Sequence, residues 1–355
     1  MQRQFVPFGQ RWSIRMPVPY SALVVDGDRA WSSGQLALDP VGAVRAPGDL
    51  AAQARIIADN IAALLAEGGL NAAAVSRLVL YSAAHDPAAQ AKAETFFARR
   101  FGPDTLIETV PVPHFYYDGV LLEVDVFCAR AQPVEGEALP GGGSARVMRE
   151  DELVLVNLTA PPASLGQAIG GLLNRHALSP DQLLSGWGIA PEPMLSAVPG
   201  QVAPRLPGFF AGALMPCYQI GDQVHLYLTF GTGEVEIAER RGERVRLHLA
   251  RAGTLAVLDG RYLGGREVGL DAQTEAVMAE LGKVLAEHGM SFTDVVKSTT
   301  FYAGGNTAEE LHGNLAIRNR YYSAPGPAST GVPIARMADP GAKVRIELVL
   351  RPTSG

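Results

Sequence analysis

Two carboxylates two residues apart offer the first chemistry in this sequence. Glu123 and Asp125 lie in the alternating segment VLLEVDVFCAR, which is typical of a β-strand, so both side chains are predicted on one face. Two carboxylates on one face can raise one pKa and supply a general acid or base. The alternative is a solvated edge face without a catalytic role, and for Asp125 we expect a structural role.

A second feature is Ser33-Gly34 in AWSSGQLALDP. Here a strand pattern gives way to a hydroxyl and a residue without a side chain, just before an acidic proline turn. The pair marks either a plain strand end or a place where a substrate lies against the backbone.

A third feature is the segment PVPHFYYDG, which follows Glu108 and contains His114, Tyr116 and Tyr117. Rings and hydroxyls of this kind can line a pocket, although aromatic side chains beside a turn also serve simple packing. His114 could titrate near neutral pH and act as an acid or base, or it could be an ordinary packing residue.

These residues must be positioned by a repeated set of elements. The order in the first part of the chain is ββαβαββ, with helices predicted over 51–69 and 88–102 from apolar residues at three- and four-residue spacing. The series restarts near the end of the chain, where DAQTEAVMAELGKVLAEHGMSFTDVVKSTTFYAG matches the first helix, loop and strand.

The middle of the chain is interpreted as a degenerate third copy. DELVLVNLTA matches the second strand, while the second helix is reduced to the Pro-rich MLSAVPGQVAPRLPG. Gly119, Gly221 and Gly341 precede equivalent final strands. The predicted division is unit 1 at 1–130, a Pro/Gly-rich linker at 131–144, unit 2 at 145–240 and unit 3 at 241–355. The alternative is two units separated by an unrelated insert.

Composition excludes several classes of function. A net charge of −6 and a pI of about 5.7 argue against nucleic acid as a partner. The two cysteines, Cys128 and Cys217, lack metal-type or disulfide spacing, which indicates a reducing compartment. No signal core or membrane-spanning run is found, so we expect a cytoplasmic protein without membrane contact. We expect neither a metal nor another cofactor, because ligand-spaced residues and a phosphate-binding loop are missing.

The motif PYSALVVDGDRAWSSGQLALDP, the helix with Gln53, and GVLLEVDVF together resemble the Rid family, also called YjgF or endoribonuclease L-PSP-like. The resemblance is specific for 17–130, good for 242–351 and weak for 145–240. It implies an α+β fold of Rid-like (chorismate mutase-like) units, three of which close into a barrel-like trimer with sites in the clefts between them. This chain is therefore expected to form an intramolecular pseudo-trimer as a monomer, with a homo-oligomer left open.

Active members of this family hydrolyse enamines and imines such as 2-aminoacrylate and release ammonia. Their site contains a Tyr, a Ser-Gly pair, an Arg that clamps the substrate carboxylate and a Glu that positions water. Tyr20, Ser33, Gly34 and Glu123 match this pattern. The resemblance thus implies catalytic roles for Tyr20, Ser33 and Glu123, and substrate contact at Gly34.

The family's arginine has no match at its own place in the strand. That place falls near Glu108 in the first unit, Phe210 in the second and Ser329 in the third. Because a Glu would repel a carboxylate, the substitution indicates a neutral or cationic substrate, with Glu108 setting specificity.

The sequence favours a cofactor-independent enzyme, of the hydrolase, deaminase or lyase kind, in small-molecule metabolism or biosynthesis. Its substrate would be a reactive enamine, imine or enol in one inter-unit cleft, with Glu108, His114, Tyr116 and Tyr117 as further substrate contacts. One alternative is a chorismatase-like enol-ether hydrolase, which would use a Glu where this chain has Arg345. The other is a non-catalytic Rid-fold protein that binds a metabolite.

Overall fold

The computed structural model contains three β-sheets with the same strand order. It describes residues 2–9, 11–209, 214–217, 221–264, 268–304 and 307–352. The first sheet runs β1 (Gln4–Pro7), β2 (Ser21–Asp26), β3 (Arg29–Ser32), β7 (Leu122–Cys128), β5 (Val75–Ser82), β6 (Leu106–Pro111), and the short β4 (Gln35–Leu36) also pairs with β7. The second runs β8 (Glu135–Leu139), β9 (Gly143–Arg149), β10 (Leu153–Ala160), β13 (Val224–Gly231), β11 (Leu183–Ala190), β12 (Leu214–Pro216). The third runs β14 (Glu236–Arg241), β15 (Val245–Ala252), β16 (Leu255–Tyr262), β19 (Val344–Leu350), β17 (Val295–Tyr302), β18 (Ala328–Pro333).

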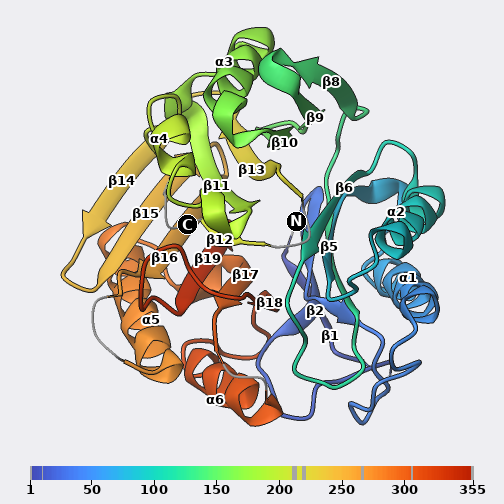
Figure 1. Cartoon of the computed structure of the whole chain (residues 1–355). Helices are drawn as coiled ribbons and strands as arrows, with labels where there is room; N and C mark the ends of the chain where they lie inside the picture. Colours follow the sequence, from blue (N-terminus) through green and yellow to red (C-terminus); the bar gives the residue numbers. More distant parts are fainter. Residues whose placement is uncertain are drawn as a thin grey trace.

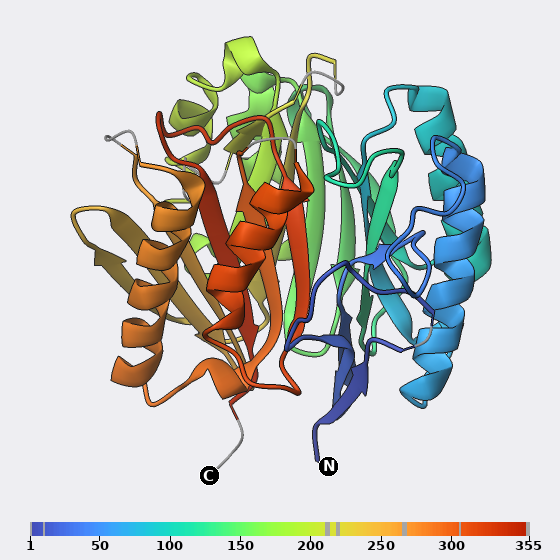
Figure 2. The ribbon, with the colours of Figure 1, turned by 90° about the horizontal axis from the view of Figure 1, so that it is seen from below.

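The helices lie on the outside of the three sheets, which face one another around the centre of the molecule (Figures 1 and 2). They are α1 (Leu50–Glu67) and α2 (Pro87–Phe101) in the first unit, α3 (Leu165–His176) and α4 (Val198–Val202) in the second, and α5 (Leu270–Glu287) and α6 (Ala308–Asn319) in the third. The predicted α+β fold with three repeated units in one chain is confirmed. The middle segment is a unit of the same topology rather than an unrelated insert.

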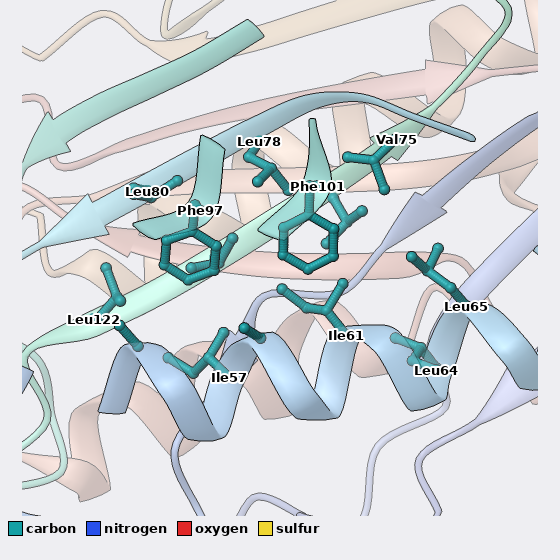
Figure 3. Close-up of a cluster of buried hydrophobic side chains, with 14 of the residues drawn as sticks. Ile57, Ile61, Leu64, Leu65, Val75, Leu78, Leu80, Phe97, Phe101 and Leu122 are labelled. Atoms are coloured by element: carbon teal, nitrogen blue, oxygen red, sulfur yellow. The ribbon is translucent and has the colours of Figure 1, made fainter. Parts of the chain in front are cut away.

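Each unit has its own hydrophobic core between helices and sheet. In the first unit, Ile57, Ile61 and Leu64 of α1 pack with Phe97 and Phe101 of α2 against the sheet (Figure 3). The three- and four-residue spacing of these apolar side chains puts them on one face of each helix, which is why the pattern predicted helices here.

The repeat is preserved in hydrogen bonds as well as in strand order. Gln53 of α1 donates to the carbonyl of Gly119 at 2.7 Å, and Gln273 of α5 donates to the carbonyl of Gly341 at 2.8 Å. The three predicted equivalent glycines, at 119, 221 and 341, all have positive φ (83°, 62° and 79°). Only glycine adopts such a turn without strain, so its recurrence before each final strand has a physical cause.

Two features of the predicted division need correction. Residues 135–139, inside the segment interpreted as a linker, form the edge strand β8 of the second sheet. Strand β14 begins at Glu236 and pairs with β15, so the third unit begins before residue 241. Both are edge strands with mostly exposed residues, and for that reason the alternation that marks a half-buried strand is weak. The predicted loss of a full second helix from unit 2 is confirmed, because α4 has only five residues.

The three interfaces between units are chemically different. Asp125 of the first unit forms a buried ion pair with Lys297 of the third at 2.9 Å. In the third unit, Glu347 accepts a hydrogen bond from Ser185 of the second at 2.5 Å. Tyr227 of the second unit donates to the carbonyl of Thr109 in the first at 3.1 Å. These unlike pairs distinguish the three interfaces.

Candidate functional site

One cleft, between the first and third units, brings together most of the predicted site. Its polar lining includes Tyr20, Glu123 and Arg318, and Gly34 lies at its wall. The rest of the lining is mainly apolar and aromatic, with contributions from both units and from the segment that precedes β2. Main-chain hydrogen bonds hold this interface closed, among them Ser21 N to the carbonyl of Pro327 at 3.0 Å.

The Glu123 carboxyl lies directly over the backbone of Gly34. Glu123 is on β7, and the short strand β4 that follows Gly34 pairs with β7 beside it. A Cβ placed on residue 34 would come within 1.8 Å of Glu123 Oε1 and 2.5 Å of its Cδ. The bare backbone seen in the sequence is therefore required by the close approach of this carboxyl group.

Burial raises the pKa of Glu123 to about 8, and the neighbouring Asp125 adds to the rise while Lys297 opposes it. At neutral pH the carboxyl is therefore mostly protonated, and it can change its protonation state within the physiological range. Asp125 itself does not line the cleft. It is fully buried behind it, where it pairs with Lys297 and accepts a hydrogen bond from Thr330 at 2.5 Å.

An arginine that sequence reasoning missed lies in the same cleft. Arg318 is in the last turn of α6, a position where the helix dipole favours a cation, and its side chain is fully buried. Its Nε donates to Asn314 Oδ1 at 2.9 Å, and Asn314 in turn donates to Thr274 Oγ1 of α5 at 2.6 Å. Its Nη1 is 3.5 Å from the hydroxyl of Ser329, and its Nη2 is buried without a hydrogen-bond partner among the described residues.

A buried guanidinium with an unused N–H group is typical of a site that binds an anion. The cost of desolvating such a charge is recovered only by a partner that accepts its hydrogen bonds. The fork geometry of a guanidinium matches a carboxylate best. The cleft thus contains an arginine on a helix that can bind a carboxylate, whereas the strand position carries Ser329.

Tyr20 and Ser33 have different surroundings. Burial raises the pKa of the Tyr20 phenol, and the charge on Arg318 partly opposes this rise. Its ring lies edge-on to Tyr322 of the third unit, 5.6 Å away. Ser33 does not line the cleft: its hydroxyl donates to the carbonyl of Ser21 at 2.7 Å and accepts from the backbone N–H of Ser329 at 2.8 Å. The second of these bonds joins the first and third units.

The aromatic segment after Glu108 contributes two of its predicted contacts. Tyr116 and Tyr117 line the cleft, and Tyr116 packs against Tyr302 of the third unit with ring centroids 5.3 Å apart. Tyr117 bonds to His312 of α6 at 3.0 Å. His114 lies outside the lining and packs edge-on against Tyr116 at 5.3 Å.

The prediction that Glu108 replaces the family's arginine in this cleft is wrong. Glu108 lies opposite Val79 in its sheet, as Thr330 lies opposite Thr299 in the third, so the equivalent of Ser329 in the first unit is Ile107. A one-residue shift along a strand turns a side chain to the other face. Glu108 instead faces a central cavity between the three sheets, 3.7 Å from Arg77. The argument for a neutral or cationic substrate therefore fails for the Glu123 cleft.

The other two units carry no carboxylate where the first carries Glu123. Arg345 stands there in the third unit, fully buried, with its Nε 2.9 Å and its Nη2 2.8 Å from Asp259. In the second unit the residue is His225, whose pKa is lowered by burial. Phe210, the second unit's counterpart of the missing arginine, lies outside the described residues. Within the described ranges, no cluster of three or more His, Cys, Asp or Glu side chains could hold a metal ion.

Comparison with known proteins finds a family model that matches part of the chain. Residues 244–351 match the family model described as endoribonuclease L-PSP. The resemblance to the Rid family is confirmed. Solved structures of this family are similar to about one third of the chain. The YjgF gene product of Escherichia coli is 25% identical over 36% of this chain and 98% of its own, with a TM-score of 0.31.

Two further solved structures match a similar share. A member of the YjgF/YER057c/UK114 family from Mycobacterium tuberculosis is 22% identical over 36% of this chain and 98% of its own, with a TM-score of 0.29. TdcF of Escherichia coli, solved with bound serine, is 22% identical over 36% of this chain and 99% of its own, with a TM-score of 0.31. No curated protein matches the chain. In the part of the chain that the structure describes, no helix is long and apolar enough to cross a membrane.

Proposed function

We propose that the cleft between the first and third units hydrolyses a small imine or enamine that carries a carboxylate. The observation that carries this proposal is the pairing of two groups in one largely apolar cleft. Glu123 has a pKa raised to about 8, and Arg318 is a buried cation with an N–H group that has no partner among the described residues. The first can move protons, and the second can hold an anionic substrate.

In the proposed reaction, the protonated Glu123 gives its proton to the nucleophilic carbon of an enamine, which becomes an iminium ion. The Glu123 carboxylate then removes a proton from water as the water oxygen bonds to the iminium carbon, which gives a neutral carbinolamine. The hydroxyl proton of the carbinolamine passes to its nitrogen as the carbon–nitrogen bond breaks, so that ammonia leaves and a ketone remains. One water is consumed for each ammonia released, and Glu123 regains its proton.

Each cleft residue has a part in this scheme. Arg318 holds the substrate carboxylate and so fixes the reacting carbon near Glu123. The small size of Gly34 lets the Glu123 carboxyl reach its place. Tyr20 and Tyr116 orient the substrate. Burial of the cleft excludes bulk water, which keeps both electrostatic interactions strong.

The test uses 2-imino acids generated in place from amino acids by an amino-acid oxidase. Semicarbazide traps the imine, so hydrolysis by the protein appears as a reduced yield of semicarbazone. We expect Glu123→Gln to lower the rate by roughly a hundredfold or more, the usual size of a general acid–base contribution. Arg318→Met should raise KM strongly, because it removes the carboxylate anchor.

A matched control lies two residues further along the chain. Arg320 is exposed and pairs with Glu275 at the surface, so Arg320→Met should leave both kcat and KM unchanged. If the wild-type protein binds unreactive carboxylates through Arg318 but hydrolyses no imine, the non-catalytic binding role replaces the proposal. If Arg318→Met and Arg320→Met behave alike, the anchor assigned to Arg318 is wrong.

The enol-ether alternative finds less support. It would place a catalytic carboxylate at residue 345 of the third unit, where the chain has an arginine held by Asp259. Glu347, two residues on, is already bonded to Ser185 and Arg345.

A further inference from the structure

The chain before β2 forms one wall of the Glu123 cleft. Phe8, Trp12, Ile14 and Val18 line the cavity from this segment, and we call these four residues the N-terminal wall. Hydrogen bonds fix this wall to the first unit. Trp12 Nε1 donates to Gln35 Oε1 at 3.0 Å, and the backbone N–H of Ser13 donates to the carbonyl of Asp39 at 3.1 Å.

Helix α6 supplies the facing apolar surface. Leu311 and Leu315 line the cleft and stand seven and three residues before Arg318, so all three side chains share one face of the helix. The guanidinium thus stands at the end of an apolar stripe. Leu36 and Val120 of the first unit complete the apolar lining.

Polar groups are few in the cleft, and most of its lining is apolar. The groups that can bind charge or move a proton are Glu123 and Arg318, and Ser329 and the tyrosines add hydroxyl groups. The N-terminal wall and the leucines of α6 offer a ligand no hydrogen bond, because the N–H of Trp12 is already donated to Gln35. A ligand that fills the cleft must match this lining. Each methylene group moved from water to such a surface gains free energy, and a polar group placed there loses its hydrogen bonds to water.

We propose that the substrate carries an apolar side chain, branched or aromatic, next to its carboxylate, and that the N-terminal wall selects it. This inference rests on the proposed function of the cleft and specifies its substrate class. It separates this site from one built for a two- or three-carbon imine, for which the wall would provide no contact.

Binding of unreactive carboxylates to the full chain tests the inference without requiring turnover. Calorimetric titration with propionate, succinate, 3-methylbutanoate and 3-phenylpropionate compares side chains of different size and polarity. We expect 3-phenylpropionate to bind roughly tenfold or more tightly than propionate, and succinate to bind no better than propionate. Equal affinity for propionate and 3-phenylpropionate, or a preference for succinate, would overturn the inference.

The wall can be tested separately from the anchor. Ile14→Asn should weaken binding of 3-phenylpropionate several-fold and leave propionate unchanged, while Val41→Asn, at a side chain that is 80% exposed, should change neither. A loss of affinity for both acids in Ile14→Asn, or for neither, contradicts the role of the wall. Replacing 3-phenylpropionate with its amide removes the carboxylate and keeps the apolar side chain. The change in affinity therefore tests the carboxylate site at Arg318 separately from the wall.

Discussion

The carboxyl group of Glu123 lies over the backbone of Gly34, so close that a Cβ on residue 34 would stand 1.8 Å from Oε1. Glu123 and Gly34 are far apart in the chain but in close contact in the fold. Residue 34 must therefore be a glycine for Glu123 to take this position. This contact explains why residue 34, just after the strand that ends at Ser32, is a glycine. It also places the titrating carboxyl of the cleft at a defined point.

Gly34→Ala should lower turnover by roughly a hundredfold while leaving a folded protein. The added methyl group must displace the Cγ, Cδ and Oε1 atoms of Glu123, all of which it would approach within 2.8 Å. A displacement of about 1 Å at a reacting group costs on the order of a hundredfold in rate. Gly233→Ala is the matched control, because a Cβ there meets no atom within 4 Å. Semicarbazide competition measures both, and equal rates for the two variants would refute the contact's importance.

The raised pKa of Glu123 predicts a pH dependence of stability. Its pKa is about 8 in the folded chain against an ordinary value of 4.5, so between these values the folded state holds a proton that the unfolded state has released. The free energy of unfolding should therefore fall as pH rises through this window, by about 1.4 kcal/mol per pH unit from this group. The contribution is complete below pH 4.5 and is lost as pH passes 8.

Glu123→Gln removes that titration. Urea unfolding at several pH values between 5 and 8 should show a shallower decline for the variant than for the wild-type chain. Parallel curves for the two proteins would mean that Glu123 titrates normally, which would also remove the basis for its role as a proton donor at neutral pH.

The ion pair between Asp125 and Lys297 should stabilise the interface that forms the cleft. Both side chains are buried, so Lys297→Met leaves an uncompensated carboxylate and should cost about 3–5 kcal/mol. Lys283 pairs with Glu280 at the surface, and Lys283→Met should cost less than about 1 kcal/mol. Denaturant unfolding compares the two variants. The double variant Asp125→Asn, Lys297→Met should recover part of the lost free energy of unfolding. If the double variant instead loses the sum of what the two single variants lose, the two residues do not interact.

The chain should behave as a monomer, because its three units already provide the three interfaces of the ring. Light scattering should give a mass near 37.6 kDa at micromolar concentration. A stable species of about three times this mass would mean that the units assemble between chains as well, and that the cleft needs a different assignment of partners.

Much of the site within the first unit could be predicted from sequence, because its residues fall in motifs that resemble the Rid family. Tyr20 stands just before β2, Gly34 between β3 and β4, and Glu123 on β7, and the structure brings the three to one cleft. Glu108 could not be placed, because the prediction required a register accurate to one residue. A strand reverses its faces at every step, so an error of one residue moved this carboxylate from the central cavity into the wrong site.

Arg318 was missed because it belongs to another unit and to a helix rather than to the expected strand. A signal for it is present in the sequence. Leu311, Leu315 and Arg318 follow helical spacing, so the arginine continues a buried apolar stripe and must be satisfied inside the protein. Sequence periodicity marks such a residue as unusual, but only the packing of the third unit against the first shows which cleft it enters.

The measurement that tests the central claim most directly is a crystal structure of the full chain with 2-oxobutanoate, the ketone product expected from a four-carbon imine. The claim predicts one ordered molecule between the first and third units, with its carboxylate on the guanidinium of Arg318 and its ketone carbon facing Glu123. A molecule ordered in one of the other two clefts or in the central cavity, or one whose carboxylate points away from Arg318, would contradict it.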